Sequence, residues 1–255
     1  MSKVLCIIQA RMGSSRLPGK ILKVVNGKSL LANEIERVRR AKRIATVVVA
    51  TSTAPQDDDL EAFCRTQRVE CFRGSELDVL SRYAECSRRY PEYNTIVRIC
   101  GDCPLIDPEV IDGVIELFEK QQVDFASNVA PPTFPDGMDV EVMTREILEQ
   151  ADQQAVLPSE REHVTQYLHK NSQVTKANLA AVQDDSQVRL TVDNPEDFEV
   201  ISFLMQHTPA NAGYREYVAM LAQHPEVLER NRHIQRNEGL KKSLQADEGY
   251  QKKHK

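Results

Sequence analysis

Three basic residues lie close together near the N-terminus, in a segment that also contains two glycines. They are Arg11, Arg16 and Lys20, and Gly13 and Gly19 lie between them. Guanidinium and ammonium groups bind phosphate oxygens, and glycine lets the backbone approach an anion without a Cβ in the way. The segment therefore predicts a binding site for a nucleoside triphosphate. The alternative is an ordinary turn with three solvated cations.

The spacing of this segment excludes two common phosphate-binding loops. A Walker A loop has four residues between its glycine and the Gly-Lys pair, and Ser or Thr follows. Here five residues separate Gly13 from Gly19, and Ile21 follows Lys20. The G-x-G-x-x-G fingerprint of dinucleotide-binding folds is also missing after the first apolar run.

Two aspartates, Asp102 and Asp193, follow apolar runs at 95–100 and 188–192 that we expect to be strands. Because parallel strands end at the same edge of a sheet, we expect both carboxylates and the basic segment to face one crevice. Two carboxylates beside triphosphate oxygens are a typical magnesium site. Each aspartate also has a local interpretation, as an Asx turn and as a helix N-cap respectively.

The elements that must position these residues predict an α/β fold. Apolar runs of strand length alternate with helical periodicity, which is typical of a mostly parallel sheet between helices. Prolines at 131, 132 and 135 predict a small β excursion or loop over 131–142. Further along, the pattern predicts helices over 144–155 and 159–170 and strands over 174–182 and 188–192.

Composition narrows the class of protein. The 255 residues carry 33 Lys and Arg against 38 Asp and Glu, a net charge of -5, which does not favour nonspecific nucleic-acid binding. No apolar stretch approaches the roughly 20 residues of a membrane span, and the N-terminus lacks a signal-peptide pattern, so we expect a cytoplasmic protein. The six cysteines are scattered, and only Cys100 and Cys103 form a C-x-x-C pair. Without a second pair, a zinc or redox role is not favoured.

Six motifs follow one another along nearly the whole chain, at 8–20, 73–80, 101–107, 135–141, 161–165 and 189–197, and a tail motif lies at 236–244. In this order they resemble the acylneuraminate (CMP-sugar) cytidylyltransferase family, most closely its spore coat polysaccharide biosynthesis protein F branch. The resemblance implies a three-layer, Rossmann-like nucleotide-diphospho-sugar transferase fold. It also implies transfer of a cytidylyl group from CTP to an acceptor, with Mg²⁺ as cofactor and pyrophosphate as the leaving group.

The resemblance assigns roles to the nucleotide side of the site. It implies that Arg11, Arg16 and Lys20 bind the triphosphate and stabilise the leaving pyrophosphate, and that Asp102 and Asp193 hold Mg²⁺. Nucleoside contacts are implied for Ala10, Gly13, Ser75 and Arg98. The sugar-acid members of the family have Asp-Glu-Pro where this chain has Asp102-Cys103-Pro104.

On the acceptor side, Asp136, Asp139 and Glu141 lie on the excursion, and Arg161 and His163 open a predicted helix. We expect an acidic sugar or a similar small acceptor, used in surface polysaccharide synthesis. Its carboxylate would require Arg161, and its hydroxyl would require a base such as His163 or Glu141. The alternative is a surface ion pair for Arg161 and a packed imidazole for His163.

The domain prediction is a catalytic domain over 1–225 and a polar helical tail over 226–255, in a chain that the resemblance implies to be a homodimer. Two other functions remain open. One is a glycosyltransferase that uses a nucleotide-sugar donor, for which Asp57-Asp58-Asp59 nominally supplies an Asp-x-Asp motif, although this run also suits a helix start. The other is a non-catalytic nucleotide-binding protein.

Overall fold

The computed structural model describes residues 4–253. Its strands are β1 (Val4–Gln9), β2 (Val24–Val25), β3 (Lys28–Ser29), β4 (Ile44–Ser52), β5 (Glu70–Gly74), β6 (Thr95–Cys100), β7 (Phe125–Ser127), β8 (Glu141–Thr144) and β9 (Lys176–Asn178). Its helices are α1 (Leu30–Arg39), α2 (Asp58–Thr66), α3 (Val79–Arg88), α4 (Pro108–Gln121), α5 (Arg145–Gln154), α6 (Pro158–Glu162), α7 (Gln166–Lys170), α8 (Pro195–His207), α9 (Tyr214–Gln223), α10 (Pro225–Leu228) and α11 (Glu238–Lys253), with 3-10 turns at Lys20–Leu22 and Pro55–Asp57.

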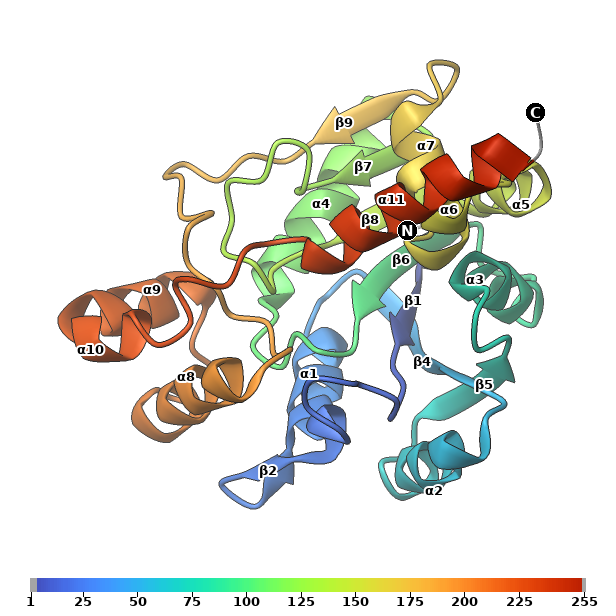
Figure 1. Ribbon diagram of the computed structural model, residues 1–255. Helices are drawn as coiled ribbons and strands as arrows, with labels where there is room; N and C mark the ends of the chain where they lie inside the picture. The colour runs from blue at the N-terminus through green and yellow to red at the C-terminus, as the bar shows by residue number, and fades with distance from the viewer. Residues whose placement is uncertain (1–3, 254–255) are drawn as a thin grey trace.

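Seven strands form the central sheet, in the order β5-β4-β1-β6-β8-β7-β9 (Figure 1). Neighbouring strands are parallel except around β8, which is antiparallel to both β6 and β7. The predicted mostly parallel sheet is therefore confirmed. The predicted small β excursion corresponds to the chain between β7 and β8. This segment reverses the direction of the chain, so that β8 runs antiparallel to β7.

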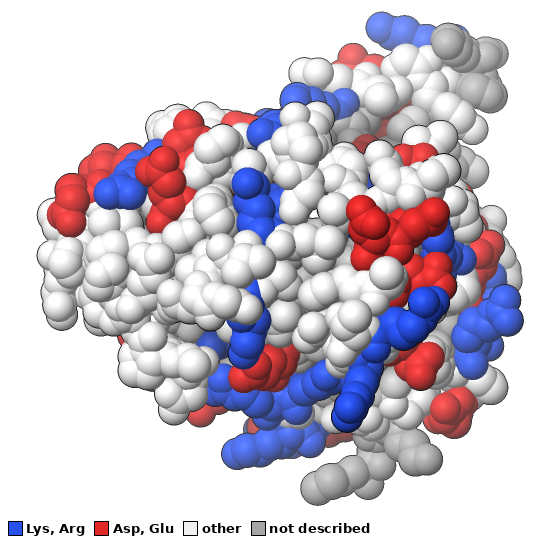
Figure 2. Space-filling view, turned by 90° about the horizontal axis from the view of Figure 1, so that it is seen from below, with Lys and Arg blue, Asp and Glu red and all other residues white. Residues whose placement is uncertain are grey.

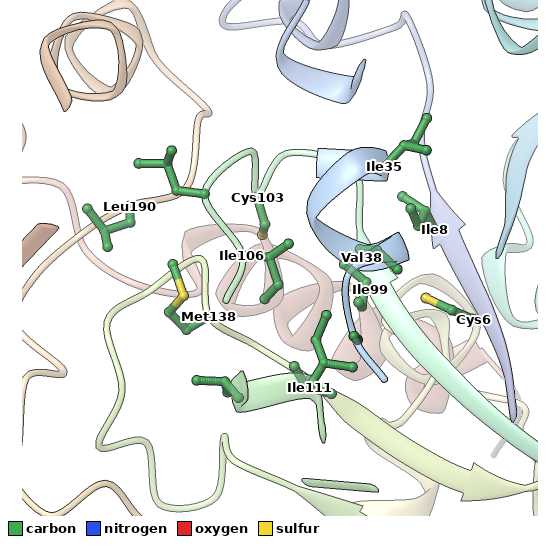
Figure 3. Packing of buried hydrophobic residues seen from close by; sticks show 14 of the residues in the cluster. Cys6, Ile8, Ile35, Val38, Ile99, Cys103, Ile106, Ile111, Met138 and Leu190 are labelled. Carbon is green, nitrogen blue, oxygen red and sulfur yellow. The ribbon is translucent and has the colours of Figure 1, made fainter. Parts of the chain in front are cut away.

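Helices cover both faces of the sheet, so β1 is buried on both sides. Cys6 and Ile8 belong to the larger apolar core, together with side chains of α1 and α4, whereas Leu5 and Ile7 belong to the core under α3 and α5. Figure 3 shows part of the larger core, where Ile35 of α1 lies near Ile8. This double burial is what a continuous apolar strand requires.

Local signals in the sequence set several helix starts. The Ser29 hydroxyl accepts a hydrogen bond from Ala32 N at 3.2 Å and caps α1. At α4, the Asp107 carboxylate accepts from Glu109 N at 2.9 Å, and Pro108 occupies the first helical position. Both caps were predicted from the sequence.

The predicted helix over 159–170 is wrong, since the structure has two short helices there. α6 ends at Glu162 and α7 begins at Gln166. Between them Val164 has φ 60°, a left-handed conformation that cannot continue a helix.

The predicted strand over 188–192 is also wrong, and the one over 174–182 is reduced to β9. The backbone N–H groups of this segment donate hydrogen bonds to loops instead of to a strand of the sheet. Leu190 N donates to Asp136 O at 2.6 Å, and Val192 N donates to Asp102 O at 2.9 Å. An apolar pattern reports burial but not the hydrogen-bond partner. The segment is nonetheless extended alongside the turn that follows β6.

The C-terminal helix α11 returns across the molecule and packs on α6 (Figure 1). The buried Asp247 carboxylate accepts hydrogen bonds from Ser159 N at 2.9 Å and from Ser159 Oγ at 2.6 Å. One turn earlier, Ser243 Oγ donates to Glu162 at 2.6 Å. The last helix is therefore fixed to the body of the protein by buried polar contacts.

The surface mixes charges of both signs. Figure 2 shows one face on which basic and acidic side chains are interspersed among uncharged residues, in keeping with the small net charge of -5. Over residues 4–253, no helix has the length and apolar character needed to cross a bilayer.

Candidate active site

Lys20 lies at the centre of the candidate site and joins the basic loop to both aspartates. Its Nζ donates to Asp102 Oδ2 at 2.9 Å, to Asp193 Oδ1 at 2.9 Å and to Val192 O at 2.7 Å. Gly19 precedes it with φ 65°, a conformation that glycine adopts readily, and this turns the chain into the Lys20–Leu22 turn. The structure thus brings together the loop and the two carboxylates that were expected to converge.

The charges of this cluster stabilise one another. Burial alone would lower the pKa of Lys20, but Asp102 and Asp193 outweigh it and raise that pKa above its ordinary value. Burial would raise the pKa of Asp193, but Lys20, with smaller contributions from Arg16 and Arg189, lowers it to about 2. The ammonium and this carboxylate therefore both stay charged near neutral pH.

A cavity of about 300 Å³, the nucleotide cavity, opens above this cluster at the carboxyl ends of β1 and β6. Gly101 allows β6 and the end of β1 to meet there, because a Cβ on it would lie 2.8 Å from the Ala10 Cβ. The lining of the nucleotide cavity includes most of the residues that were predicted to bind the nucleotide or its metal, namely Ala10, Arg11, Gly13, Arg16, Lys20, Arg98, Asp102 and Asp193.

The basic loop is held from below by Asp57, whose role the sequence analysis did not foresee. The fully buried Asp57 accepts a hydrogen bond from Met12 N at 2.7 Å and one from Ser52 N at 3.1 Å. Burial would raise its pKa, but these bonds lower it, so the carboxylate is ionised. Asp57 therefore anchors the loop, and no sequence pattern distinguishes it from its two acidic neighbours.

A second cavity of about 260 Å³, the acceptor-side cavity, adjoins the first and shares Arg16, Arg98, Asp102 and Asp193 with it. The predicted acceptor residues Asp136 and Asp139 line it, but both are engaged in ion pairs. Asp136 accepts from Arg189 at 2.6 Å, and Asp139 accepts from Arg236. Burial, only partly offset by Arg236, raises the pKa of Asp139 to about 7.

Arg189 lines the acceptor-side cavity and binds Asp193, which lines both cavities. Its guanidinium contacts Asp193 at 2.9 Å and the buried Asp197 at 2.8 Å, in addition to Asp136. Burial would lower the pKa of Arg189, but hydrogen bonding to Asp197 and the nearby carboxylates raise it. Arg189 is only 6% exposed, and its ion pair with Asp193 holds that carboxylate in place.

Glu141 is not a free base, contrary to the prediction. It is buried and paired with the Arg98 guanidinium, and it accepts a hydrogen bond from Thr165 Oγ1 at 2.7 Å. Burial would raise its pKa, but Arg98 and His169 lower it to about 2. A carboxylate with these partners is a weak proton acceptor near neutral pH.

Arg161 does not reach the site either. Its guanidinium pairs with Asp78 and with Asp152, at 2.9 Å for each, and it lines neither cavity. Ser75, predicted to contact the nucleoside, also lies outside both linings, and its Oγ accepts a hydrogen bond from Asp78 N at 3.0 Å. Sequence alone did not reveal that Asp78 would be the partner of both.

His163 lines both cavities and is joined to the C-terminal helix. Its Nε2 shares a hydrogen bond with Ser243 Oγ at 2.9 Å. Burial lowers the pKa of this imidazole, which favours the neutral form. The tail also supplies residues that sequence reasoning missed, since Gln235, Asn237 and Glu238 line the acceptor-side cavity and Glu238 pairs with Arg16 at 3.1 Å.

The donor atoms at Asp102 and Asp193 fit a hard divalent cation bound together with phosphate oxygens. Their side chains are 27% and 25% exposed, so oxygen atoms of both reach the nucleotide cavity. Among residues 4–253, no group of three His, Cys, Asp or Glu could hold a metal by itself. Two carboxylates plus phosphate and water are the ligands that Mg²⁺ prefers.

The two cysteines beside this centre are protonated thiols. Burial raises the pKa of Cys100 to about 12, and burial followed by the charge of Asp102 raises the pKa of Cys103 well above its ordinary value. The thiolate is the form that binds metals and exchanges disulfides, so both residues serve as packing groups here.

Comparison with known proteins connects this geometry to a family. The family described as cytidylyltransferase matches residues 5–234. The spore coat polysaccharide biosynthesis protein SpsF of Bacillus subtilis is 34% identical over 241 residues, covering 89% of this chain and 97% of its own. A structure of a cytidylyltransferase from Leptospira borgpetersenii is 34% identical, with a TM-score of 0.86 over 92% of this chain and 100% of that one.

A more distant structure shares the fold. The CMP:2-keto-3-deoxy-manno-octonic acid synthetase complexed with CTP superimposes with a TM-score of 0.61 at 20% identity, over 80% of this chain and 99% of that one. The family match over residues 5–234 includes the basic loop and both aspartates. The chain belongs to the cytidylyltransferase family.

Proposed function

We propose that the protein transfers the cytidylyl group of CTP to a hydroxyl of a small sugar-like acceptor and releases pyrophosphate, with Mg²⁺ bound. The observation that carries this proposal is the junction of Lys20 with Asp102 and Asp193, on the floor of a cavity lined by the basic loop. An acidic sugar is the acceptor expected from the sequence, and the synthetase with CTP is named for such an acid.

In the proposed reaction the acceptor oxygen attacks the α-phosphorus of CTP, and the bond from this phosphorus to the β-phosphate oxygen breaks. Negative charge grows on the departing pyrophosphate, which Arg11, Arg16 and Lys20 would stabilise. Asp102 and Asp193 would hold Mg²⁺, which neutralises charge on the phosphate oxygens when bound. Lys20 also keeps both carboxylates in position before the substrate arrives.

The acceptor hydroxyl must lose a proton. His163 is the residue that we propose for this role, because its imidazole lines both cavities and burial favours its neutral form. Glu141 is already committed to Arg98 and Thr165.

Further proposals concern the setting of the enzyme. A role in surface polysaccharide synthesis is supported by the name of the Bacillus subtilis relative. A cytoplasmic location is supported by the presence of six free cysteines. The homodimer and the division into 1–225 and 226–255 remain predictions from the sequence.

The glycosyltransferase alternative loses its main support. Asp57, the first carboxylate of the nominal Asp-x-Asp motif, is fully buried and anchors the basic loop, so it is not available as a metal ligand of such a motif.

The test is pyrophosphate release, measured with CTP, Mg²⁺ and a panel of small sugars, with UTP and ATP as parallel donors. We expect release with CTP that stops when the metal is chelated. Consumption of a supplied nucleotide sugar without any pyrophosphate from CTP would instead establish a glycosyltransferase.

A further inference from the structure

Two of the sequence motifs, at 161–165 and at 236–244, meet in the structure in one hydrogen-bonded group. Its members are Glu162 and His163, at the end of α6, and Ser243, on α11. Ser243 Oγ lies 2.6 Å from Glu162 Oε2 and 2.9 Å from His163 Nε2. The hydroxyl therefore joins a carboxylate to the imidazole that lines both cavities.

The number of protons in this group decides which nitrogen of His163 carries hydrogen. A serine hydroxyl has one proton to donate, and carboxylate and carbonyl oxygens only accept. The Ser243 hydroxyl has two such acceptors, Glu162 Oε2 at 2.6 Å and Gly239 O at 3.2 Å. Toward the imidazole, Ser243 Oγ is then left as an acceptor, so His163 Nε2 must donate. The neutral imidazole thus has its hydrogen on Nε2 and its lone pair on Nδ1.

The surroundings of the two nitrogens agree with this tautomer. Glu162 Oε2 lies 3.9 Å from His163 Nε2, too far for a hydrogen bond, but its negative charge favours an N–H group on that side of the ring. Among residues 4–253, His163 Nδ1 forms no hydrogen bond, and the side chain is 25% exposed. Nδ1 is therefore the nitrogen that remains for a ligand.

The fold fixes His163 from two sides. His163 N donates to Ser159 O at 2.9 Å, and the left-handed Val164 ends the helix directly after the imidazole. Ser159 is held in turn by Asp247 of α11, through bonds of 2.9 Å and 2.6 Å. Asp247 lies one helical turn after Ser243, and both are 6% exposed on the face of α11 that packs on α6 (Figure 1). The position of the imidazole thus depends on α11.

Charged groups from four elements face this imidazole. Burial lowers the pKa of His163, and the carboxylate of Glu162 on α6 opposes that shift. Arg98 of β6 lowers the pKa further, whereas Asp247 of α11 and Glu141 of β8 raise it. The net shift is downward, so the imidazole is neutral at and above neutral pH.

We propose that Ser243 is a positioning residue of the active site, which holds His163 with its hydrogen on Nε2 and so leaves Nδ1 to take the proton of the acceptor hydroxyl. The inference rests on the proposed cytidylyl transfer and names the atom that acts as its base. As the acceptor oxygen bonds to the α-phosphorus, its proton passes to Nδ1, and the bond to pyrophosphate breaks with its electron pair on the leaving oxygen. The resulting imidazolium keeps its Nε2–H bond to Ser243, with the charge of Glu162 behind it.

The first test observes the tautomer directly, by ¹⁵N NMR of the protein labelled at histidine, with His163→Gln to identify the signals. Above neutral pH and without any ligand, we expect a protonated Nε2 and an unprotonated Nδ1. The Nε2–H proton should be visible, because its hydrogen bond to Ser243 slows exchange with water. A protonated Nδ1, or an Nε2–H proton in fast exchange, overturns the proposal.

The second test removes the hydroxyl in Ser243→Ala. We expect the Nε2–H signal to be lost to exchange with water. With CTP, Mg²⁺ and the small sugar that gives the fastest pyrophosphate release, kcat should fall by about tenfold, the equivalent of about 1.4 kcal/mol, while the KM for CTP changes by less than about twofold. Gln245→Ala, at an exposed position of the same helix that lines neither cavity, should change neither signal nor rate.

A persistent Nε2–H signal or an unchanged kcat in Ser243→Ala contradicts the role of this residue, and so does an equal loss in Gln245→Ala. The NMR signature needs neither CTP nor an acceptor. The absence of pyrophosphate release from the unchanged protein with every sugar would therefore refute the proposed transfer, and with it the role of Nδ1 as its base, whereas a missing signature refutes the positioning by Ser243 alone.

Discussion

The two cavities of the site are built in different ways. The nucleotide cavity is formed mainly by one short loop and by the ends of adjacent parallel strands, β1 and β6, and Asp193 and His163 complete it from later in the chain. The acceptor-side cavity joins the excursion, the segment before α8 and the chain leading into α11, which are far apart in the sequence. The basic loop that would bind phosphate is thus a local feature of this chain, although its aspartate partners are distant in sequence, whereas the acceptor side is assembled almost entirely by the tertiary structure.

The charges differ in the same way. In the nucleotide cavity, Arg11 lines the wall and Lys20 lies on the floor between two carboxylates that a metal can share. On the acceptor side, Arg98 and Arg189 are committed to the carboxylates of Glu141, Asp136 and Asp197. The comparison predicts that variants on the nucleotide side change catalysis, while variants of the committed pairs change mainly stability.

The largest effect is expected for Asp193→Asn. The amide keeps the shape of the side chain but loses the charge that we assign to Mg²⁺, so pyrophosphate release should fall by about a thousandfold or more, about 4 kcal/mol. Circular dichroism should show an intact fold. The matched control is Glu196→Gln, three residues along at an exposed position, which should keep full activity. Full activity in Asp193→Asn would remove this residue from the metal site.

Lys20→Ala should slow pyrophosphate release by about a hundredfold and raise the KM for CTP, because both the bound phosphates and the departing pyrophosphate lose a charge partner. Steady-state kinetics over a range of CTP concentrations measures both changes. Lys23→Ala is the control, since Lys23 lines neither cavity. An unchanged response to CTP would contradict the assignment of the loop.

Glu141→Gln should lower the free energy of unfolding by about 2 kcal/mol, because it leaves Arg98, whose side chain is only 16% exposed, without its charge partner. The folded-state pKa of Glu141 is about 2, below its ordinary 4.5, so its stabilisation is present above pH 4.5 and is lost as the pH falls through about 2. Denaturant unfolding at several pH values should therefore show a weaker acid dependence in the variant. The exposed Glu146→Gln should match the unchanged protein, and an equal loss in both variants would refute the role of the pair.

The smallest effect is expected for Arg161→Met. Loss of its partly exposed bonds to Asp78 and Asp152 should cost about 1 kcal/mol of stability and should change neither KM by more than about twofold. Thermal unfolding and acceptor saturation kinetics measure the two quantities. A large rise in the KM for the acceptor alone would show that Arg161 binds the acceptor, and would contradict the difference proposed between the two cavities.

The same contrast explains how far the sequence could predict the structure. The loop, β6 and the caps at Ser29 and Asp107 depend on neighbouring residues, and local patterns predicted them. The segment 188–192 reads as a strand because it is apolar, but no pattern could tell that its hydrogen bonds go to the turns around Asp102 and Asp136.

Side-chain partners on the acceptor side were beyond local patterns as well. Arg161 and Glu141 have the residue types for substrate binding, but their partners come from other parts of the chain and occupy them. Glu238 lies within the tail motif at 236–244, but nothing in that motif marks it as a wall of the cavity. Only the folded structure gives these residues their roles.

The central claim is that Lys20, Asp102 and Asp193 organise a triphosphate and its metal in the nucleotide cavity. A crystal structure with Mg²⁺ and a non-hydrolysable CTP analogue tests it most directly. We predict phosphate oxygens in contact with Arg11, Arg16 and Lys20, and a metal ion bound by both Asp102 and Asp193. A triphosphate outside the basic loop, or a metal bound by neither aspartate, would contradict the account.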